Sequence, residues 1–289
     1  MVFLFHPKNL RESLLSYNFD LKSWTDRNTM SYNAIKPTFL KTKDGLNIAA
    51  KKLEGHPPTI IFMPGFFSNM EGTKAKFLEQ QCRSRGQAYI RFDYRGHGQS
   101  DGKFEDGTVT DWLNDTLLVL DELAEVPVVA VGSSMGGWIA LLAALKRPNL
   151  IKGLVGVASS PDFTRDIWHR RMTNQQRKQM NEQGFVAQPS EYREEPVIIT
   201  KQLIDDGENH LLLHRENLDL NIPVCLIHGK KDVDVQWKKS EKLHQLLGEE
   251  NSELILVPDG PHRLSRDKDL KLIDKKVHEI SNIISSFMS

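Results

Sequence analysis

Short apolar runs alternate with longer amphipathic segments along most of the chain. Six runs are almost wholly apolar, which is typical of strands buried on both faces of a parallel sheet. These runs are residues 59–63, 88–92, 128–131, 154–158, 224–228 and 254–257. A more polar segment, residues 47–52, predicts an early edge strand.

Helix-length segments separate these runs. Their apolar side chains recur at helical spacing, which predicts helices over residues 73–85, 108–124, 135–147, 237–247 and 270–288. Regular alternation of strand and helix favours right-handed crossovers. The pattern therefore predicts an α/β fold, with a mostly parallel sheet wrapped by helices.

One stretch interrupts the alternation. The 50 residues from 161 to 210 lie between two predicted strands and show helical rather than strand-like patterns. They are too many for a simple crossover, so we interpret them as an inserted helical cap. In open α/β folds such a cap lies over the edge of the sheet where ligands bind. We place the main domain at 38–289 and interpret 1–37 as an N-terminal extension or a weak transit segment.

Composition excludes some classes of function. The 289 residues include 38 basic and 38 acidic side chains, so the formal net charge is zero. Nucleic-acid-binding proteins usually carry a basic excess, and we therefore expect no nucleic-acid partner. With 39% hydrophobic residues the chain is not disordered. Its two cysteines, Cys82 and Cys225, lie in apolar surroundings and are expected to be buried, reduced thiols.

The uncharged run from 128 to 145 approaches the length of a membrane span. Glycines and serines in its middle favour a strand, a tight turn and a helix instead, so we expect no stable membrane insertion. The apolar N-terminus lacks the features of a secretory signal. The composition of residues 6–30 fits both a poor transit peptide and a simple N-terminal extension. The sequence does not indicate an oligomeric state.

The strongest motif is the pentapeptide Gly132-Ser133-Ser134-Met135-Gly136. It follows one predicted strand and begins one predicted helix, which is the context of a nucleophile elbow. We predict that Ser134 is a catalytic nucleophile and that the backbone N–H of Met135 stabilises an oxyanion. The alternative is a Gly/Ser turn that only packs a helix against a strand.

A catalytic serine needs a histidine base that is oriented by a carboxylate. In this architecture the chain order is Ser, then Asp or Glu, then His. Asp232 follows the fifth apolar run and His262 follows the sixth, so we predict these two residues for the two roles. Asp234 competes with Asp232 for the orienting role. His228 is expected to shape the turn under the acid.

The second oxyanion donor is expected in the loop after the first apolar run, at the N–H of Phe66. A glycine-rich loop, residues 92–100, could cradle a phosphate, but it lacks the lysine spacing of a P-loop. We expect it to buttress the nucleophile turn. These groups complete a hydrolytic site without help, so we expect no cofactor and no metal.

With these motifs, the sequence resembles the α/β-hydrolase superfamily from about residue 38 to the C-terminus. Segments 60–75, 90–102 and 131–145 are also similar to the abhydrolase-domain mitochondrial palmitoyl-protein thioesterases, a family also described as acyl-glucuronide esterases. The resemblance implies Ser134, Asp232 and His262 as charge-relay residues. It also implies S-acylated cysteines and acyl-glucuronides as substrates and the mitochondrion as the compartment. Because only about 36 residues precede the fold, the cytoplasm is the alternative compartment.

Other functions on the same fold are a general carboxylesterase or lipase and, from a different class, a non-catalytic binding protein. The expected partners are S-acylated proteins or small acyl esters as substrates. The predicted cap contains apolar side chains that either line an acyl pocket or simply pack the cap onto the sheet. They are Phe163, Ile167, Trp168, Met172, Met180, Phe185, Ile198, Ile199 and Leu203.

The zero net charge conceals an uneven distribution. Residues 164–181 contain five basic and one acidic side chain, and residues 191–208 contain six acidic and two basic ones. One interpretation is two solvated faces that attract each other. The other is that the basic half attracts an anionic substrate such as a glucuronide.

Overall fold

The computed structural model describes residues 35–189 and 195–287. Residues 37–289 belong to one compact unit. Most of the predicted N-terminal extension, 1–37, lies outside the described residues, as do residues 190–194 of the predicted cap.

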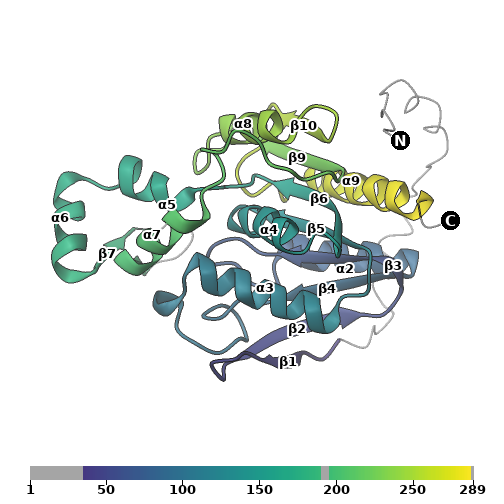
Figure 1. The fold of residues 1–289 in the computed structure, drawn as a ribbon, viewed down its shortest axis with the longest axis horizontal. Helices are drawn as coiled ribbons and strands as arrows, with labels where there is room; N and C mark the ends of the chain where they lie inside the picture. Colours follow the sequence, from purple (N-terminus) through teal and green to yellow (C-terminus); the bar gives the residue numbers. More distant parts are fainter. Residues whose placement is uncertain (1–34, 190–194, 288–289) are drawn as a thin grey trace. The chain divides into compact units, whose positions relative to one another are not determined.

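An eight-stranded sheet forms the centre of this unit, in the order β1-β2-β4-β3-β5-β6-β9-β10 (Figure 1). Strands β1 and β2 are antiparallel to their neighbours, and the other six strands are parallel. The bounds are β1 Thr38–Lys41, β2 Asn47–Leu53, β3 His56–Met63, β4 Gln87–Phe92, β5 Val128–Ser133, β6 Ile151–Val157, β9 Val224–Gly229 and β10 Ser252–Val257.

All the predicted strands of the sheet are present, but the prediction that residues 47–52 form its edge is wrong. The edge strand is β1, which pairs with β2 from Thr38 opposite Ala50 to Lys41 opposite Asn47. The four residues of β1 are mostly exposed and have no clear alternating pattern, so no strand could be predicted from them.

Helices cover both faces of the sheet, as the alternation predicted. The main ones are α2 Thr73–Arg85, α3 Val109–Leu123, α4 Met135–Lys146, α8 Lys238–Leu247 and α9 Asp267–Ser286. Alternate residues of the parallel strands point to opposite faces. Ile61 therefore packs in one core cluster with α3, α4 and α8, whereas Ile60 packs in a second cluster with α2 and α9.

The segment between β6 and β9 contains both helices and strands. It consists of α5 Phe163–Asp166, the π-helical turn η4 Ile167–Arg171, α6 Asn174–Gln183, β7 Phe185–Gln188, β8 Val197–Thr200, α7 Lys201–Gly207 and the 3₁₀ turn η5 Glu208–His210. The expectation that this segment lacks strands is wrong, because β7 and β8 form an antiparallel pair. The β-branched run at 197–200 was the missed signal.

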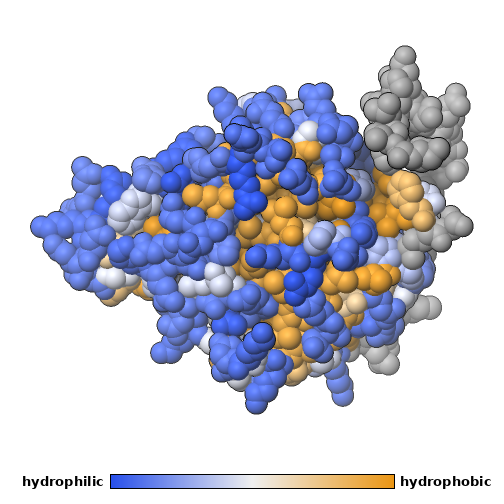
Figure 2. Space-filling model, viewed as in Figure 1, coloured by the Kyte–Doolittle hydropathy of each residue, from blue (hydrophilic) through white to orange (hydrophobic). Residues whose placement is uncertain are grey.

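The outer surface of this segment is mostly hydrophilic where it is seen at the left of Figure 2. Its helix α6 is polar at almost every position and buries only Met180. Hydrogen bonds connect the two ends of the segment. The carboxylate of Asp162 accepts the backbone N–H groups of Leu212 and Leu213 at 2.9 and 3.0 Å. The segment is therefore anchored at its base, with its polar face in solvent.

None of the described helices is both long and apolar enough to span a membrane. The uncharged run that prompted this question is divided between β5 and α4. Ten residues of α4 are buried, so its apolar surface packs against protein.

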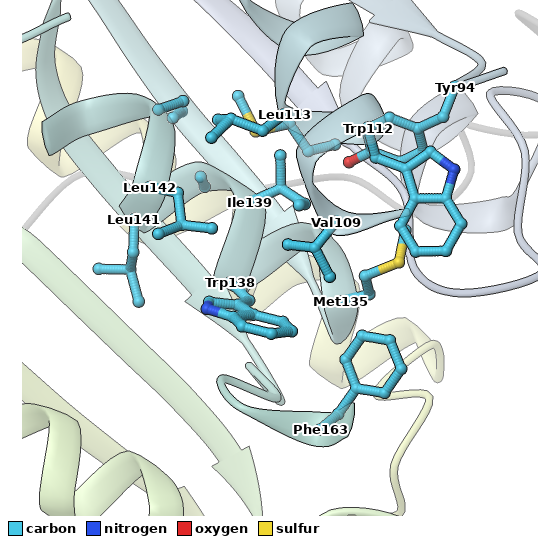
Figure 3. Packing of buried hydrophobic residues seen from close by; sticks show 14 of the residues in the cluster. Tyr94, Val109, Trp112, Leu113, Met135, Trp138, Ile139, Leu141, Leu142 and Phe163 are labelled. Carbon is cyan, nitrogen blue, oxygen red and sulfur yellow. The ribbon is translucent and has the colours of Figure 1, made fainter. Parts of the chain in front are cut away.

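Trp138 of α4 joins the main sheet layer to the segment between β6 and β9. Its indole is fully buried and packs edge-on against Phe163, with ring centroids 5.5 Å apart (Figure 3). The indole Nε1–H donates to the carbonyl of His210 at 3.1 Å. One side chain thus contacts the first and the last helical turns of this segment.

We expect Trp138→Ala to lower the free energy of unfolding by about 3–5 kcal/mol, because it leaves a large cavity and an unpaired carbonyl. Urea denaturation measures this change. Phe39→Ala is the control, since that ring is 52% exposed and its removal should change stability by at most about 0.5 kcal/mol. Equal losses in the two variants would contradict the bridging role of Trp138.

Candidate active site

The turn between β5 and α4 holds Ser134 in a conformation that favours glycine, with φ 56° and ψ −118°. Its neighbours leave no room for larger side chains. A Cβ on Gly132 would lie 2.2 Å from the carbonyl oxygen of Gly136, and one on Gly136 would lie 2.1 Å from that of Met63. The glycines therefore allow β3, β5 and the start of α4 to converge beneath the serine.

The structure brings the predicted base and acid to this serine. His262 Nε2 lies 3.1 Å from Ser134 Oγ, across 128 residues of sequence. His262 Nδ1 lies 2.7 Å from Asp232 Oδ2. Asp232 and His262 lie on the loops after β9 and β10, at the carboxyl end of neighbouring parallel strands.

The Asp232 side chain is 0% exposed, yet both of its oxygens accept hydrogen bonds. Oδ1 accepts the backbone N–H groups of Asp234 and Val235 at 2.9 and 2.8 Å. Oδ2 accepts from His262, and His228 Nε2 lies 3.0 Å from the same oxygen. Burial raises the pKa of Asp232, but the bonds from His228 and His262 outweigh burial and hold that pKa well below its ordinary value.

His228 has a closer relation to the site than the turn-shaping role expected from the sequence. Its ring is fully buried at the end of β9. Nδ1 lies 2.7 Å from Ser240 Oγ, and Nε2 lies within 3.0 Å of both Asp232 Oδ2 and the carbonyl of Val235. Two acceptors near Nε2 favour the tautomer that carries its proton there. His228 then donates to the same carboxylate oxygen as His262.

Asp234, the alternative to Asp232 as the orienting acid, occupies a different position in the structure. Its carboxylate does not take the position opposite His262, and its backbone N–H donates to Asp232 instead. A guanidinium N–H of Arg171 donates to the Asp234 carbonyl. The preference for Asp232 over Asp234 therefore agrees with this geometry.

The two residues predicted to supply N–H groups for oxyanion stabilisation, Phe66 and Met135, belong to backbone segments next to Ser134. A Cβ on Gly65, next to Phe66, would lie 3.2 Å from Ser134 Cβ, and Met135 is the first residue of α4. Within the described part of the chain neither N–H has a backbone acceptor outside regular structure. The first N–H groups of a helix have no acceptor inside it, so the N–H of Met135 is available to a ligand.

The loop at residues 92–100 is bonded to the segment that carries Phe66 and Phe67. The Asp93 carboxylate accepts the N–H of Met70 at 2.6 Å, which connects the two segments, and the N–H of Gln99 at 2.8 Å within its own loop. The ring of His97 lies 6.5 Å from that of Phe67, and burial lowers the pKa of His97 to about 4. Its neutral ring is suited to packing against Phe67, and support of the nucleophile turn itself stays a prediction.

A cavity of about 480 Å³ opens onto Ser134, within the range of small-molecule sites. Its apolar side chains come largely from the segment between β6 and β9, with Phe66, Phe67 and Val235 added from other loops, and most of the other side chains are polar or charged. The lining consists of Gly65, Phe66, Phe67, Ser68, Lys74, Ser133, Ser134, Ser160, Phe163, Asp166, Ile167, Arg171, Gln188, Pro189, Val197, Ile199, Asp234, Val235, His262 and Arg263.

Among the described residues, one group has the composition of a metal site: Asp232, Asp234 and His262, with ligand atoms within 4.8 Å of one another. Two of its members already hydrogen-bond to each other in the chain that ends at Ser134. The two cysteines are free and buried, as expected. Burial raises the pKa of the Cys82 thiol to about 12, which disfavours the reactive thiolate.

Comparisons with known proteins agree with this architecture. A family model described as alpha/beta hydrolase fold matches residues 58–192. A bovine relative named palmitoyl-protein thioesterase ABHD10, mitochondrial, is 40% identical over 252 residues, which cover 86% of this chain and 82% of the relative.

Two solved structures resemble the fold over the same share of the chain. Mouse alpha/beta hydrolase domain-containing protein 10 is 36% identical, with a TM-score of 0.80 over 86% of this chain and 99% of that one. A putative hydrolase from Agrobacterium vitis S4 is 34% identical, with a TM-score of 0.81 over 86% of this chain and 98% of that one.

We expect His228→Phe to lower kcat about tenfold with little change in KM, because Asp232 loses a donor that helps to fix its orientation toward His262. Steady-state kinetics with an activated ester measures both constants. Ser240→Ala is the matched control, since it removes the partner of the other ring nitrogen and should change kcat by less than about threefold. An unchanged kcat in a folded His228→Phe variant would exclude this role.

Proposed function

The chain belongs to the α/β-hydrolase family of serine hydrolases, and we propose that it cleaves acyl thioesters on proteins, removing palmitoyl groups from cysteine. We further propose that the same site hydrolyses acyl-glucuronide esters. The observation that carries the proposal is the hydrogen-bonded chain from Asp232 through His262 to Ser134, which ends in a partly apolar cavity. The thioesterase name of the bovine relative supports the choice of substrate.

In this mechanism, His262 takes the proton of the Ser134 hydroxyl as Oγ attacks the acyl carbonyl. The N–H groups of Phe66 and Met135 hold the oxyanion of the tetrahedral intermediate. As the intermediate collapses, His262 gives its proton to the leaving thiol or alcohol. A water molecule, deprotonated by His262, then hydrolyses the acyl-enzyme and restores Ser134.

Asp232 supports these steps from a fully buried position. A carboxylate with a lowered pKa stays ionised at neutral pH, so it can hold His262 in one orientation and stabilise the imidazolium that forms. The backbone bonds to Oδ1 fix the carboxylate plane. The acid therefore acts by position and charge, while His262 moves the proton.

We also propose that the segment at 161–210 acts as the cap predicted from the sequence. Of its nine apolar candidates, Phe163, Ile167 and Ile199 line the cavity, where they would contact an acyl chain. Met172, Met180 and Leu203 do not line it and are buried in the main core cluster, to which the three cavity residues also belong. Both interpretations therefore apply to Phe163, Ile167 and Ile199, and only the packing interpretation applies to the other three.

We assign the protein to the mitochondrion, because the bovine relative with 40% identity is named as mitochondrial. Its partners in this proposal are acylated substrates. A general carboxylesterase or lipase remains the second candidate, because the same catalytic groups cleave oxygen esters. A non-catalytic binding protein has less support, since nothing in a binding role requires the aligned bonds from Asp232 to Ser134.

We expect Ser134→Ala to lower kcat at least about 10³-fold and to abolish labelling by a fluorophosphonate probe, because the nucleophile is lost. Hydrolysis of a palmitoyl thioester and gel fluorescence measure the two effects. Ser133→Ala is a matched control in the same turn and should still be labelled. Full hydrolysis by Ser134→Ala would exclude this serine as the nucleophile.

We expect kcat/KM to rise with acyl-chain length, because each further methylene is buried against the apolar side chains of the cavity. Thioesters of acetyl, octanoyl and palmitoyl groups, assayed below their micellar concentrations beside matched oxygen esters, measure this dependence. A preference for short oxygen esters would favour the carboxylesterase alternative. Phe163→Ala should flatten the dependence on chain length.

A further inference from the structure

Lys74 is a charged residue of the catalytic cavity that the mechanism above does not use. It lies near the start of α2, and its side chain lines the cavity together with Ser134 and His262. Nζ donates to the carbonyl of Arg263 at 2.5 Å and lies 3.3 Å from Ser265 Oγ. Both partners belong to the loop that carries His262, so this ammonium lies on the side of the cavity formed by the histidine loop.

The ammonium of Lys74 has no carboxylate within 4.0 Å in residues 35–189 and 195–287. Burial lowers its pKa to about 8, the positive charge of Arg263 lowers that pKa further, and the more distant negative charge of Asp269 raises it. The contrast with Lys239 is informative. That lysine is buried, whereas Lys74 is partly exposed, and it forms an ion pair with Asp166 at 2.6 Å. A cation that is partly removed from water and has no anion in contact is in a position that an incoming anion would stabilise.

Donor capacity leads to the same conclusion. An ammonium has three N–H donors, and the two partners of Lys74 are neutral oxygens. The cavity lining also includes the cationic residues Arg171 and Arg263. Two carboxylates, those of Asp166 and Asp234, also line the cavity. Asp166 forms an ion pair with Lys239, which does not belong to the lining. The lining thus contains three cationic side chains and two carboxylates, one of which is already paired with a lysine from outside the lining.

We propose that Lys74 binds an anionic group, a carboxylate or a phosphate, on the leaving part of the substrate. The proposal rests on the hydrolytic function of Ser134 given above. The leaving group is the part that His262 protonates, and Lys74 is bonded to the residue that follows His262. The acyl part is assigned to the apolar side chains of the lining, such as Phe163 and Val197. Lys74 is thus a specificity-determining residue.

The test compares octanoyl thioesters of 3-mercaptopropionate and of its uncharged amide, with the thioester of 2-mercaptoethyl phosphate as a third substrate. The wild-type protein should show a higher kcat/KM for the anionic thioesters than for the amide. The third substrate distinguishes carboxylate from phosphate as the preferred anion. In Lys74→Met this preference should fall about 10- to 100-fold, because a charge-assisted hydrogen bond is lost.

Lys76→Met is the matched control. Lys76 lies on the same helix and carries the same charge, but it is exposed and is absent from the cavity lining. This variant should keep the preference of the wild-type protein. If it lost the preference as Lys74→Met does, general electrostatic attraction would explain the result, and the assigned site would be wrong.

Two other outcomes would overturn the proposal. One is a wild-type protein that does not discriminate between the anionic and neutral thioesters. The other is a Lys74→Met variant in which both rates fall equally, because Lys74 would then only position the histidine loop. Competitive inhibition of the wild-type protein by 3-mercaptopropionate, compared with its amide, makes the same comparison without a substitution and should favour the anion.

Failure of the underlying function has a separate signature. In that case the wild-type protein would hydrolyse none of the thioesters, and Ser134→Ala would match it with every substrate. Such a result would overturn the specificity proposal together with the proposed function. Hydrolysis of the neutral thioester by the wild-type protein keeps the two failures distinct.

Discussion

The backbone conformation of Ser134 is the constraint on which the rest of the site depends. A non-glycine residue at φ 56° is strained, and it persists because the surrounding backbone leaves no alternative. The carbonyl oxygens of Met63 and Gly136 lie where any Cβ on Gly136 or Gly132 would have to fit. This close approach places the Ser134 hydroxyl above the carboxyl edge of the sheet and leaves the N–H of Met135 at the start of α4. The position of the nucleophile and one oxyanion donor thus have a single physical origin.

Parallel strand order supplies the second part of the site. Strand β10 pairs with β9, so the loops that follow them lie side by side and bring His262 within 2.7 Å of Asp232. The buried carboxylate then takes four hydrogen-bonded neighbours, two from its own loop and two from histidines. His228 reaches it from the end of β9 and is itself held by Ser240 of α8. The orientation of His262 is thereby coupled to the packing of a helix outside the cavity.

The charged residues that form ion pairs in the segment between β6 and β9 are not the residue that we propose to bind the substrate anion. Most of the described charges of this segment are paired within it or with the main layer, as between Arg165 and Glu208 at 3.0 Å and between Asp166 and Lys239 at 2.6 Å. The first of these pairs joins the basic and acidic halves seen in the sequence, in line with mutual attraction of the two faces. Lys74, whose ammonium lines the cavity without an ion pair among the described residues, belongs to the main layer. The proposed anion site therefore differs from the one that the charge distribution of the cap first indicated.

The sequence by itself determined the parallel strands, the main helices and the order of Ser134, Asp232 and His262, because buried strands and nucleophile turns have strong local patterns. It did not determine the edge strand β1 or the pair β7 and β8, because short and partly exposed strands form through pairing rather than through their own pattern. Nor could it show that His228 bonds to Asp232 or that Lys74 lacks a carboxylate partner. Burial and pairing of a charge depend on segments that are distant in sequence, and only the tertiary structure brings those segments together.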